Sequence, residues 1–185
     1  PIYRFYATET FTYFDLTTPN NVRITSIVNH ILQDKDGNLW FSTNGQGLFR
    51  YNLSKNYLEQ YEFTSAFGIV ASTMADSDNQ IWALTNQGES GVYKLNKAEN
   101  KFEPFGLLYN AGNHHSQALA MLEDSEQTLW LGTWECGLQK IDKYTRQTTT
   151  YLHPTDGKGV THIHSLMEYA LDNGIGRTIC FFAEQ

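Results

Sequence analysis

The chain has 185 residues, of which 41% are hydrophobic and 14% aromatic, and this is enough apolar material for a packed core to exclude an intrinsically disordered protein. Its formal net charge is −7 and its 13 Lys and Arg residues are scattered, so the basic stripe that nucleic-acid binding requires is missing. No run approaches the roughly 18 apolar residues of a membrane helix, and the first residues lack a signal-peptide pattern, so we expect no membrane segment in this chain.

Residues 1–14 (PIYRFYATETFTYF) contain two short apolar stretches, which predict a pair of strands. Residues 2–5 match the later stretch 48–51, and Phe11 matches Tyr57. Because 48–51 and Tyr57 belong to the second half of a unit that recurs along the chain, we expect residues 1–16 to form a half-blade with a third and a fourth strand.

The recurring unit occurs three times, at 34–52 (DKDGNLWFSTNGQGLFRYN), 76–96 (DSDNQIWALTNQGESGVYKLN) and 124–142 (DSEQTLWLGTWECGLQKID). In each copy an Asp lies six residues before a Trp, a Thr lies three after it, and a Gly begins the next apolar run. The Trp residues are Trp40, Trp82 and Trp130, spaced by 42 and 48 residues. A period of this length is typical of a propeller or another repeat array.

Each unit predicts four antiparallel strands. A first apolar run (24–32, 67–74, 118–122) leads through an Asp/Gly/Asn/Ser turn to a second strand with period-two alternation (39–43, 80–85, 128–133). A third strand (48–52, 92–96, 138–142) and a short aromatic fourth strand (57–63, 101–105, 148–152) follow. Four such strands make one propeller blade, so we predict an all-β propeller and assign the repeated Trp residues to its core.

The C-terminal end predicts another half-blade, because 160–168 match the first strand and 175–178 fall where 130–133 would be. We expect one propeller domain or propeller fragment over 1–185, divided into 1–16 (half-blade), 22–63, 66–105 and 116–152 (blades) and 160–179 (half-blade). Pairing of the two half-blades would close a four-bladed ring and remove exposed sheet edges, whereas two chains that share half-blades would form a larger ring as a homodimer.

The signature Asp-x-x-Gly/Asn-x-Leu/Ile-Trp, then Thr, then Gly-Leu-x-x-Ile/Tyr-Asn/Asp resembles the two-component regulator propeller repeat over about 24–152. The second copy departs from it, with Asn79 in place of Gly and a longer insert between Thr and Gly. The resemblance implies a segment of the periplasmic sensor region of hybrid two-component regulators, which recognise glycan fragments. The kinase, the membrane helix and the immunoglobulin-like domain of such regulators do not occur in this sequence.

Candidate ligand residues lie in the loops that join second to third strands and fourth strands to the next blade. These loops share one face of a propeller, and they offer amide and carboxylate groups to bind hydroxyls and an aromatic ring to cover a sugar. The candidates are Asn44, Gln46, Asn86, Glu89, Tyr109, Asn113, His114, His115, Trp134 and Glu135.

Other site chemistries fit less well. Adjacent residues of an extended segment point to opposite sides, so His114 and His115 are a poor metal pair, and we expect neither a metal nor a cofactor. Asp34–Asn38 starts like a calcium loop, but its Gly is at position four and no Glu follows at twelve, which favours a turn. No hydrolase elbow or P-loop occurs, so we do not expect an enzyme.

The leading hypothesis is thus a non-enzymatic, periplasmic sensor propeller that binds an oligosaccharide through its loops. The alternative is a structural or protein-interaction propeller that assembles through its open half-blades, and a propeller lyase or hydrolase is the third.

Overall fold

A computed structural model describes residues 2–5, 10–13, 16–63, 68–85, 91–107, 117–134, 136–151, 162–170 and 177–184. Their strands form three consecutive four-stranded antiparallel sheets, the third of which is extended to six strands by a C-terminal hairpin. Sheet 1 contains β3 (Val28–Gln33), β4 (Leu39–Thr43), β5 (Leu48–Asn52) and β6 (Tyr57–Tyr61); sheet 2 contains β7 (Val70–Ala75), β8 (Ile81–Thr85), β9 (Gly91–Asn96) and β10 (Lys101–Leu107); sheet 3 contains β11 (Gln117–Glu123), β12 (Leu129–Trp134), β13 (Leu138–Ile141) and β14 (Thr148–Thr150). The predicted all-β fold of four-stranded antiparallel blades is confirmed. The strand ends in the three blades differ from the predicted ones by up to four residues. Nowhere in the described ranges is there a helix of the length and apolarity that a bilayer crossing needs.

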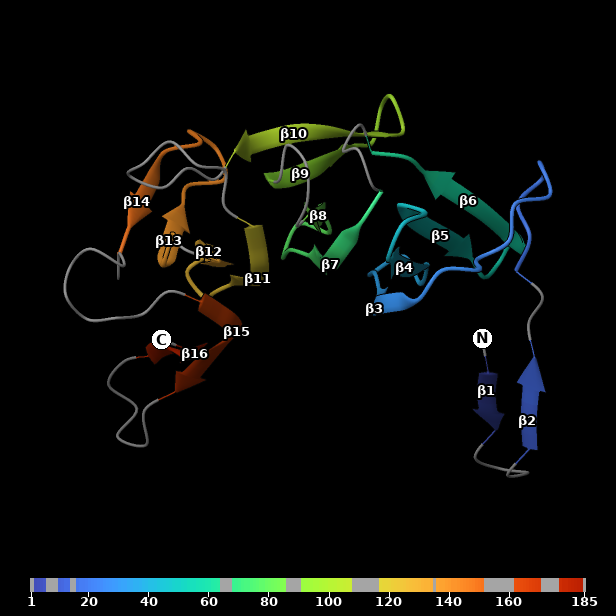
Figure 1. The fold of residues 1–185 in the computed structure, drawn as a ribbon, viewed down its shortest axis with the longest axis horizontal. Helices are drawn as coiled ribbons and strands as arrows, with labels where there is room; N and C mark the ends of the chain where they lie inside the picture. The colour runs from blue at the N-terminus through green and yellow to red at the C-terminus, as the bar shows by residue number, and fades with distance from the viewer. Residues whose placement is uncertain are drawn as a thin grey trace.

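Two hairpins flank these sheets, β1 (Ile2–Phe5) with β2 (Thr10–Tyr13) and β15 (His162–Ala170) with β16 (Arg177–Glu184). The sheets follow an arc with the first strand of each on its inner side, and the two hairpins lie apart at its ends (Figure 1). The β1–β2 pair is a separate sheet, whereas β15 adjoins sheet 3 through the pair Trp134 and His162. Among the described strands β1 and β2 pair only with each other, so closure of a four-bladed ring stays a prediction.

The repeated Asp forms a turn that also positions the Trp. In sheet 1 Asp34 Oδ1 accepts hydrogen bonds from the backbone N–H groups of Asp36 (3.0 Å) and Asn38 (2.8 Å), and Asp34 Oδ2 accepts one from Trp40 Nε1 (2.8 Å). Asp76 and Asp124 make the same contacts, with Nε1 of Trp82 at 3.0 Å and of Trp130 at 2.7 Å. A single carboxylate thus satisfies both the turn and the indole N–H, which would be costly to bury without a partner.

The positioned Trp residues of sheets 1 and 2 each pack against the next sheet along the chain. Trp40 belongs to a buried cluster with Ile81, Ala83 and Leu95 of sheet 2, and Trp82 to one with Leu129 and Leu131 of sheet 3. Trp40 and Trp82 are therefore core residues, as predicted. Trp130 is only half-buried and contacts Tyr151, with ring centroids 5.5 Å apart.

A repeated Ser–Glu contact joins successive sheets. Glu123 at the end of β11 accepts hydrogen bonds from Ser77 N (2.5 Å) and Oγ (3.1 Å), both in the turn of sheet 2. Glu168 of β15 holds Ser125 of sheet 3 in the same way, at 3.0 and 2.6 Å. Because β15 repeats the docking of β11, it occupies the position of the first strand of a further blade.

Lys143 adds an ion cluster between sheets 2 and 3. Its side chain is almost inaccessible to solvent, and its Nζ lies 2.8 Å from Glu123 Oε1, 2.9 Å from Asp78 Oδ2 and 3.6 Å from Asp76 Oδ2. Desolvation opposes the charged form of Lys143, but the hydrogen bonds to Glu123 and Asp78 outweigh it and raise the pKa of the ammonium above its usual value. The hydrogen bond from Lys143 also lowers the pKa of Asp78.

We predict that Asp124→Ala lowers the free energy of unfolding by about 2 kcal/mol, because it removes the acceptor of Trp130 Nε1 and of two backbone N–H groups. Urea unfolding followed by Trp fluorescence measures this loss. The control is Glu126→Ala in the same turn, whose exposed side chain should contribute less than about 0.5 kcal/mol. Equal losses for the two variants would contradict a special role of the Asp.

We predict that the Lys143 cluster stabilises the fold only between two pH limits. The stability that protonated Lys143 contributes is fully present below the usual Lys pKa of 10.5 and is lost as pH rises through the raised pKa. The stability that ionised Asp78 contributes is present above the usual Asp pKa of 3.8 and is lost as pH falls through the lowered pKa.

Lys143→Met should destabilise the fold at pH 7 by about 3 kcal/mol, because it leaves buried carboxylates unpaired. It should also flatten the alkaline limb of a plot of unfolding free energy against pH. Lys97→Met is the matched control, because Lys97 has the same place in the turn of sheet 2 and is exposed. An alkaline limb that Lys143→Met leaves unchanged would refute the assignment.

Candidate ligand-binding face

The loops between second and third strands lie at one end of the sheets, which we call the loop face; the opposite end, with the Asp turns and the turns between third and fourth strands, is the turn face. The repeated Thr shapes these loops. Thr43 Oγ1 donates to Gly47 O (2.7 Å) and accepts from Gln46 N (3.1 Å), and Thr133 Oγ1 donates to Gly137 O (2.8 Å) and accepts from Cys136 N (3.0 Å). The hydroxyl adds to the backbone hydrogen bonds from Thr43 N to Gly47 O (3.1 Å) and from Thr133 N to Gly137 O (3.2 Å), so the repeated Thr and Gly close each loop at its base.

In sheet 1 the loop 44–47 borders a small hollow of about 170 Å³. Its walls are Gly45, Gln46, Gly47, Gln60, Glu62, Phe63 and Gly68. Gly47 N donates to Gly68 O (2.7 Å), so the loop lies directly against the connection to sheet 2. The lining offers amide and carboxylate groups beside one aromatic ring, which is the chemistry expected of a polar ligand site.

The two predicted ligand residues of this loop differ in what they can offer. Asn44 is exposed. Gln46 Oε1 accepts hydrogen bonds from Thr25 N (2.8 Å), Thr25 Oγ1 (3.2 Å) and Ser26 N (2.7 Å), and its Nε2 donates to Arg23 O (3.0 Å). A ligand would have to replace these bonds, because Gln46 already ties the loop to the segment that precedes β3.

Trp134 is the described aromatic residue among the predicted ligand residues. Its side chain is 40% exposed at the loop end of β12, and its ring centroid lies 3.8 Å from that of His162 and 6.3 Å from that of His164. Both His residues belong to β15, so two segments distant in sequence build one aromatic surface on the loop face. An exposed ring of this kind can cover the C–H face of a sugar.

Seven predicted ligand residues, Asn86, Glu89, Tyr109, Asn113, His114, His115 and Glu135, lie outside the described residues, so their roles stay predictions. His162 and His164 are not among the predicted ligand residues. Within the described ranges no three His, Cys, Asp or Glu side chains come close enough to hold a metal ion. The contact of His162 and His164 with Trp134 requires β15 to reach the loop end of β12. The signal in the sequence that could have predicted this contact is the match of β15 to the first strand of a repeat.

Comparison with known proteins agrees with the propeller fold. Residues 21–45, which include the Asp turn and Trp40, match the family described as two component regulator propeller. The chain thus carries a two component regulator propeller repeat. No curated protein matched the sequence.

The chain also resembles several solved structures. The chain resembles the extracellular domain of the putative one component system BT4673 from B. thetaiotaomicron, with a TM-score of 0.68 and 18% identity over 95% of this chain and 22% of that one. For the extracellular domain of the putative hybrid two component system BT3049 from the same organism, the TM-score is 0.63 with 18% identity over 90% of this chain and 23% of that one.

An enzyme shares the fold as well. Virginiamycin B lyase from Staphylococcus aureus gives a TM-score of 0.64 with 17% identity over 95% of this chain and 60% of that one. These identities establish the propeller fold alone, and the chain spans only part of each of these proteins.

We predict that Gly47→Ala destabilises the fold by more than about 3 kcal/mol, because Gly47 has φ +76° and an added Cβ would lie 2.3 Å from Tyr61 O. Gly37→Ala is the matched control. Gly37 has φ +80° with no atom within 4 Å of a Cβ, so it should lose only the roughly 1–2 kcal/mol of the left-handed conformation. Thermal unfolding of both variants measures the difference, and equal melting temperatures would contradict the close approach.

Proposed function

We propose that this chain is a non-enzymatic, ligand-sensing propeller segment of a two-component regulator that binds a glycan fragment on the loop face. The observation that carries the proposal is the propeller repeat at 21–45 together with the exposed Trp134 surface on that face. Repeated residues serve the scaffold, whereas Asn44 and Trp134 occupy the same loop position, at which the three copies carry Asn, Asn and Trp. The remaining predicted ligand residues belong to these loops or to others expected at the same face.

The proposed location is periplasmic or extracellular. Two of the similar structures are extracellular domains of putative bacterial regulators, and this supports the location. It also favours a sensor over an enzyme, although the lyase shows that the same fold can support catalysis. The division of the chain into blades and half-blades given above is part of the proposal.

A structural or protein-interaction propeller is the second candidate. It is favoured by the two hairpins at the ends of the arc, since each is a short sheet portion with an edge that could pair with another chain. In that case a protein partner, or a second copy that shares half-blades, would take the place of the sugar.

We predict that a screen of neutral oligosaccharides identifies at least one that raises the melting temperature, because a ligand that binds the native state stabilises it. Trp134→Ala should weaken binding of that sugar roughly tenfold through loss of ring stacking, with native circular dichroism retained. Tyr144→Ala removes an aromatic ring that is 74% exposed on the turn face and should leave binding unchanged.

The two candidates give different outcomes in this experiment. If no oligosaccharide shifts the melting temperature while light scattering shows a concentration-dependent dimer, the sensor proposal is wrong and the interaction propeller is supported. Equal effects of Trp134→Ala and Tyr144→Ala would place the sugar elsewhere than on the loop face.

A further inference from the structure

The turn face contains a cleft between sheets 2 and 3 that the proposed function does not use. Its volume is about 350 Å³. Three cations line it, Lys94 and Lys97 of sheet 2 and Arg146 from the turn between β13 and β14, against the single carboxylate of Glu103. The amides of Gln80 and Asn96 and the ring of Phe105 complete the lining. In a chain of net charge −7, this local excess of positive charge is unexpected.

The equivalent position between sheets 1 and 2 shows what normally neutralises such charges. There Arg50 forms an ion pair with Glu59 across β5 and β6 at 2.5 Å. Glu59 also accepts a hydrogen bond from Tyr61 Oη (2.9 Å) and one from Asn100 Nδ2 (2.5 Å), and Asn100 lies in the turn of the following sheet. An internal carboxylate therefore occupies the centre of that site.

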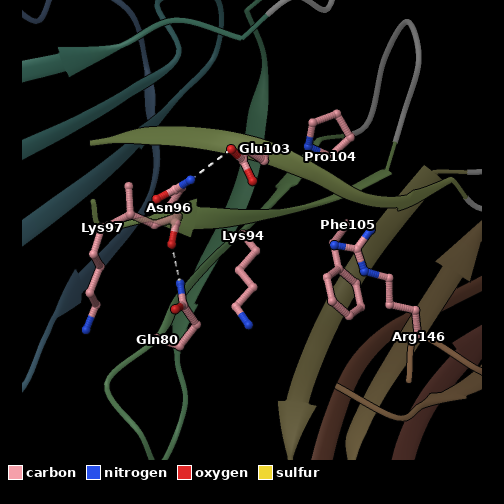
Figure 2. A pocket seen from close by; sticks show the side chains of 9 residues that line it. Gln80, Lys94, Asn96, Lys97, Glu103, Pro104, Phe105 and Arg146 are labelled. Carbon is pink, nitrogen blue, oxygen red and sulfur yellow. Dashed lines mark hydrogen bonds between the residues drawn. The ribbon is translucent and has the colours of Figure 1, made fainter. Parts of the chain in front are cut away.

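The second site has the same positions but a different arrangement of charge. Lys94 of β9 lies opposite Glu103 of β10 in the strand register, as Arg50 of β5 lies opposite Glu59 of β6. Glu103 Oε1, however, accepts a hydrogen bond from Asn96 Nδ2 (2.9 Å) and lies 4.0 Å from Lys101 Nζ. Figure 2 shows Lys94 between the Asn96–Gln80 side and the Phe105–Arg146 side of the cleft, with Glu103 directed to Asn96.

Arg146 replaces the Asn that the other two turns carry. Asn56, Asn100 and Arg146 occupy the same turn position with positive φ angles of 48°, 53° and 62°. Arg tolerates this conformation less well than Asn, so its presence there needs another reason. Its guanidinium lies 5.0 Å from the centroid of the Phe105 ring of the preceding sheet, on the border of the cleft.

No carboxylate in the described parts of the chain forms an ion pair with Lys94, Lys97 or Arg146. Lys94 instead lies over the Trp82 ring at 5.3 Å, and the nearby Asp78 is bound to Lys143. We propose that this cleft binds an external oxyanion, a carboxylate, sulfate or phosphate group, at the position that Glu59 occupies between sheets 1 and 2. The amides of Gln80 and Asn96 border the same space, and the proposal is independent of the loop-face sugar site.

Isothermal titration calorimetry at constant ionic strength tests the site, with inorganic sulfate, inorganic phosphate and glucuronate as probes and glucose as the neutral control. We expect saturable one-site binding of at least one anion and none of glucose. If glucuronate binds, the site accepts an acid attached to a sugar; if only sulfate or phosphate binds, it is an inorganic-anion site. Absence of saturable binding by all three anions would overturn the proposal.

Three variants locate the binding. Arg146→Asn restores the residue that the other turns carry, so the fold should be retained while anion affinity falls about tenfold or more. Glu103→Gln removes a negative charge from the cleft and should tighten binding. Lys55→Gln, in the exposed turn of sheet 1, is the control for general charge and should leave affinity unchanged. Equal losses for Arg146→Asn and Lys55→Gln would show non-specific attraction and refute the cleft.

Discussion

The hydrogen bonds of the repeated Asp are the interaction on which the rest of the structure depends. The carboxylate closes the turn between the first two strands and also holds the indole N–H six residues later. Because the indole is fixed in this way, Trp40 and Trp82 present their rings to the next sheet, and the inter-sheet core forms around them. A local turn motif therefore sets the spacing between sheets, since a misplaced Trp would leave a large buried void.

The polar contacts between sheets follow from that spacing. Once the cores of neighbouring sheets meet, their Asp turns come close enough for the Ser–Glu contacts and for Lys143 to bridge Asp78 and Glu123. The repeat tolerates differences here, and these differences give each junction its own chemistry. Between sheets 1 and 2 the charges are neutralised internally by Glu59, whereas between sheets 2 and 3 Lys94 and Arg146 border an open cleft.

The candidate ligand face could be predicted only in part. The alternation of strands and loops placed Asn44, Gln46 and Trp134 at the same end of the sheets, and the structure agrees with that placement. The engagement of the Gln46 amide by the segment 23–26 was not predictable, because nothing local specifies how the chain before β3 folds over the loop. The same holds for His162 beside Trp134, which requires β15 to pack on sheet 3.

The sequence by itself determined the fold class, the four-strand unit and the scaffold role of Asp, Trp, Thr and Gly, because these depend on turn geometry and period-two alternation within about twenty residues. Only the tertiary structure decided which side chains from different sheets meet, since such contacts depend on how each sheet packs against the next. Lys143, Arg146 and Lys97 are all cations in equivalent turns. Packing alone buried Lys143 in an ion pair between sheets and left Arg146 and Lys97 at the edge of a cleft.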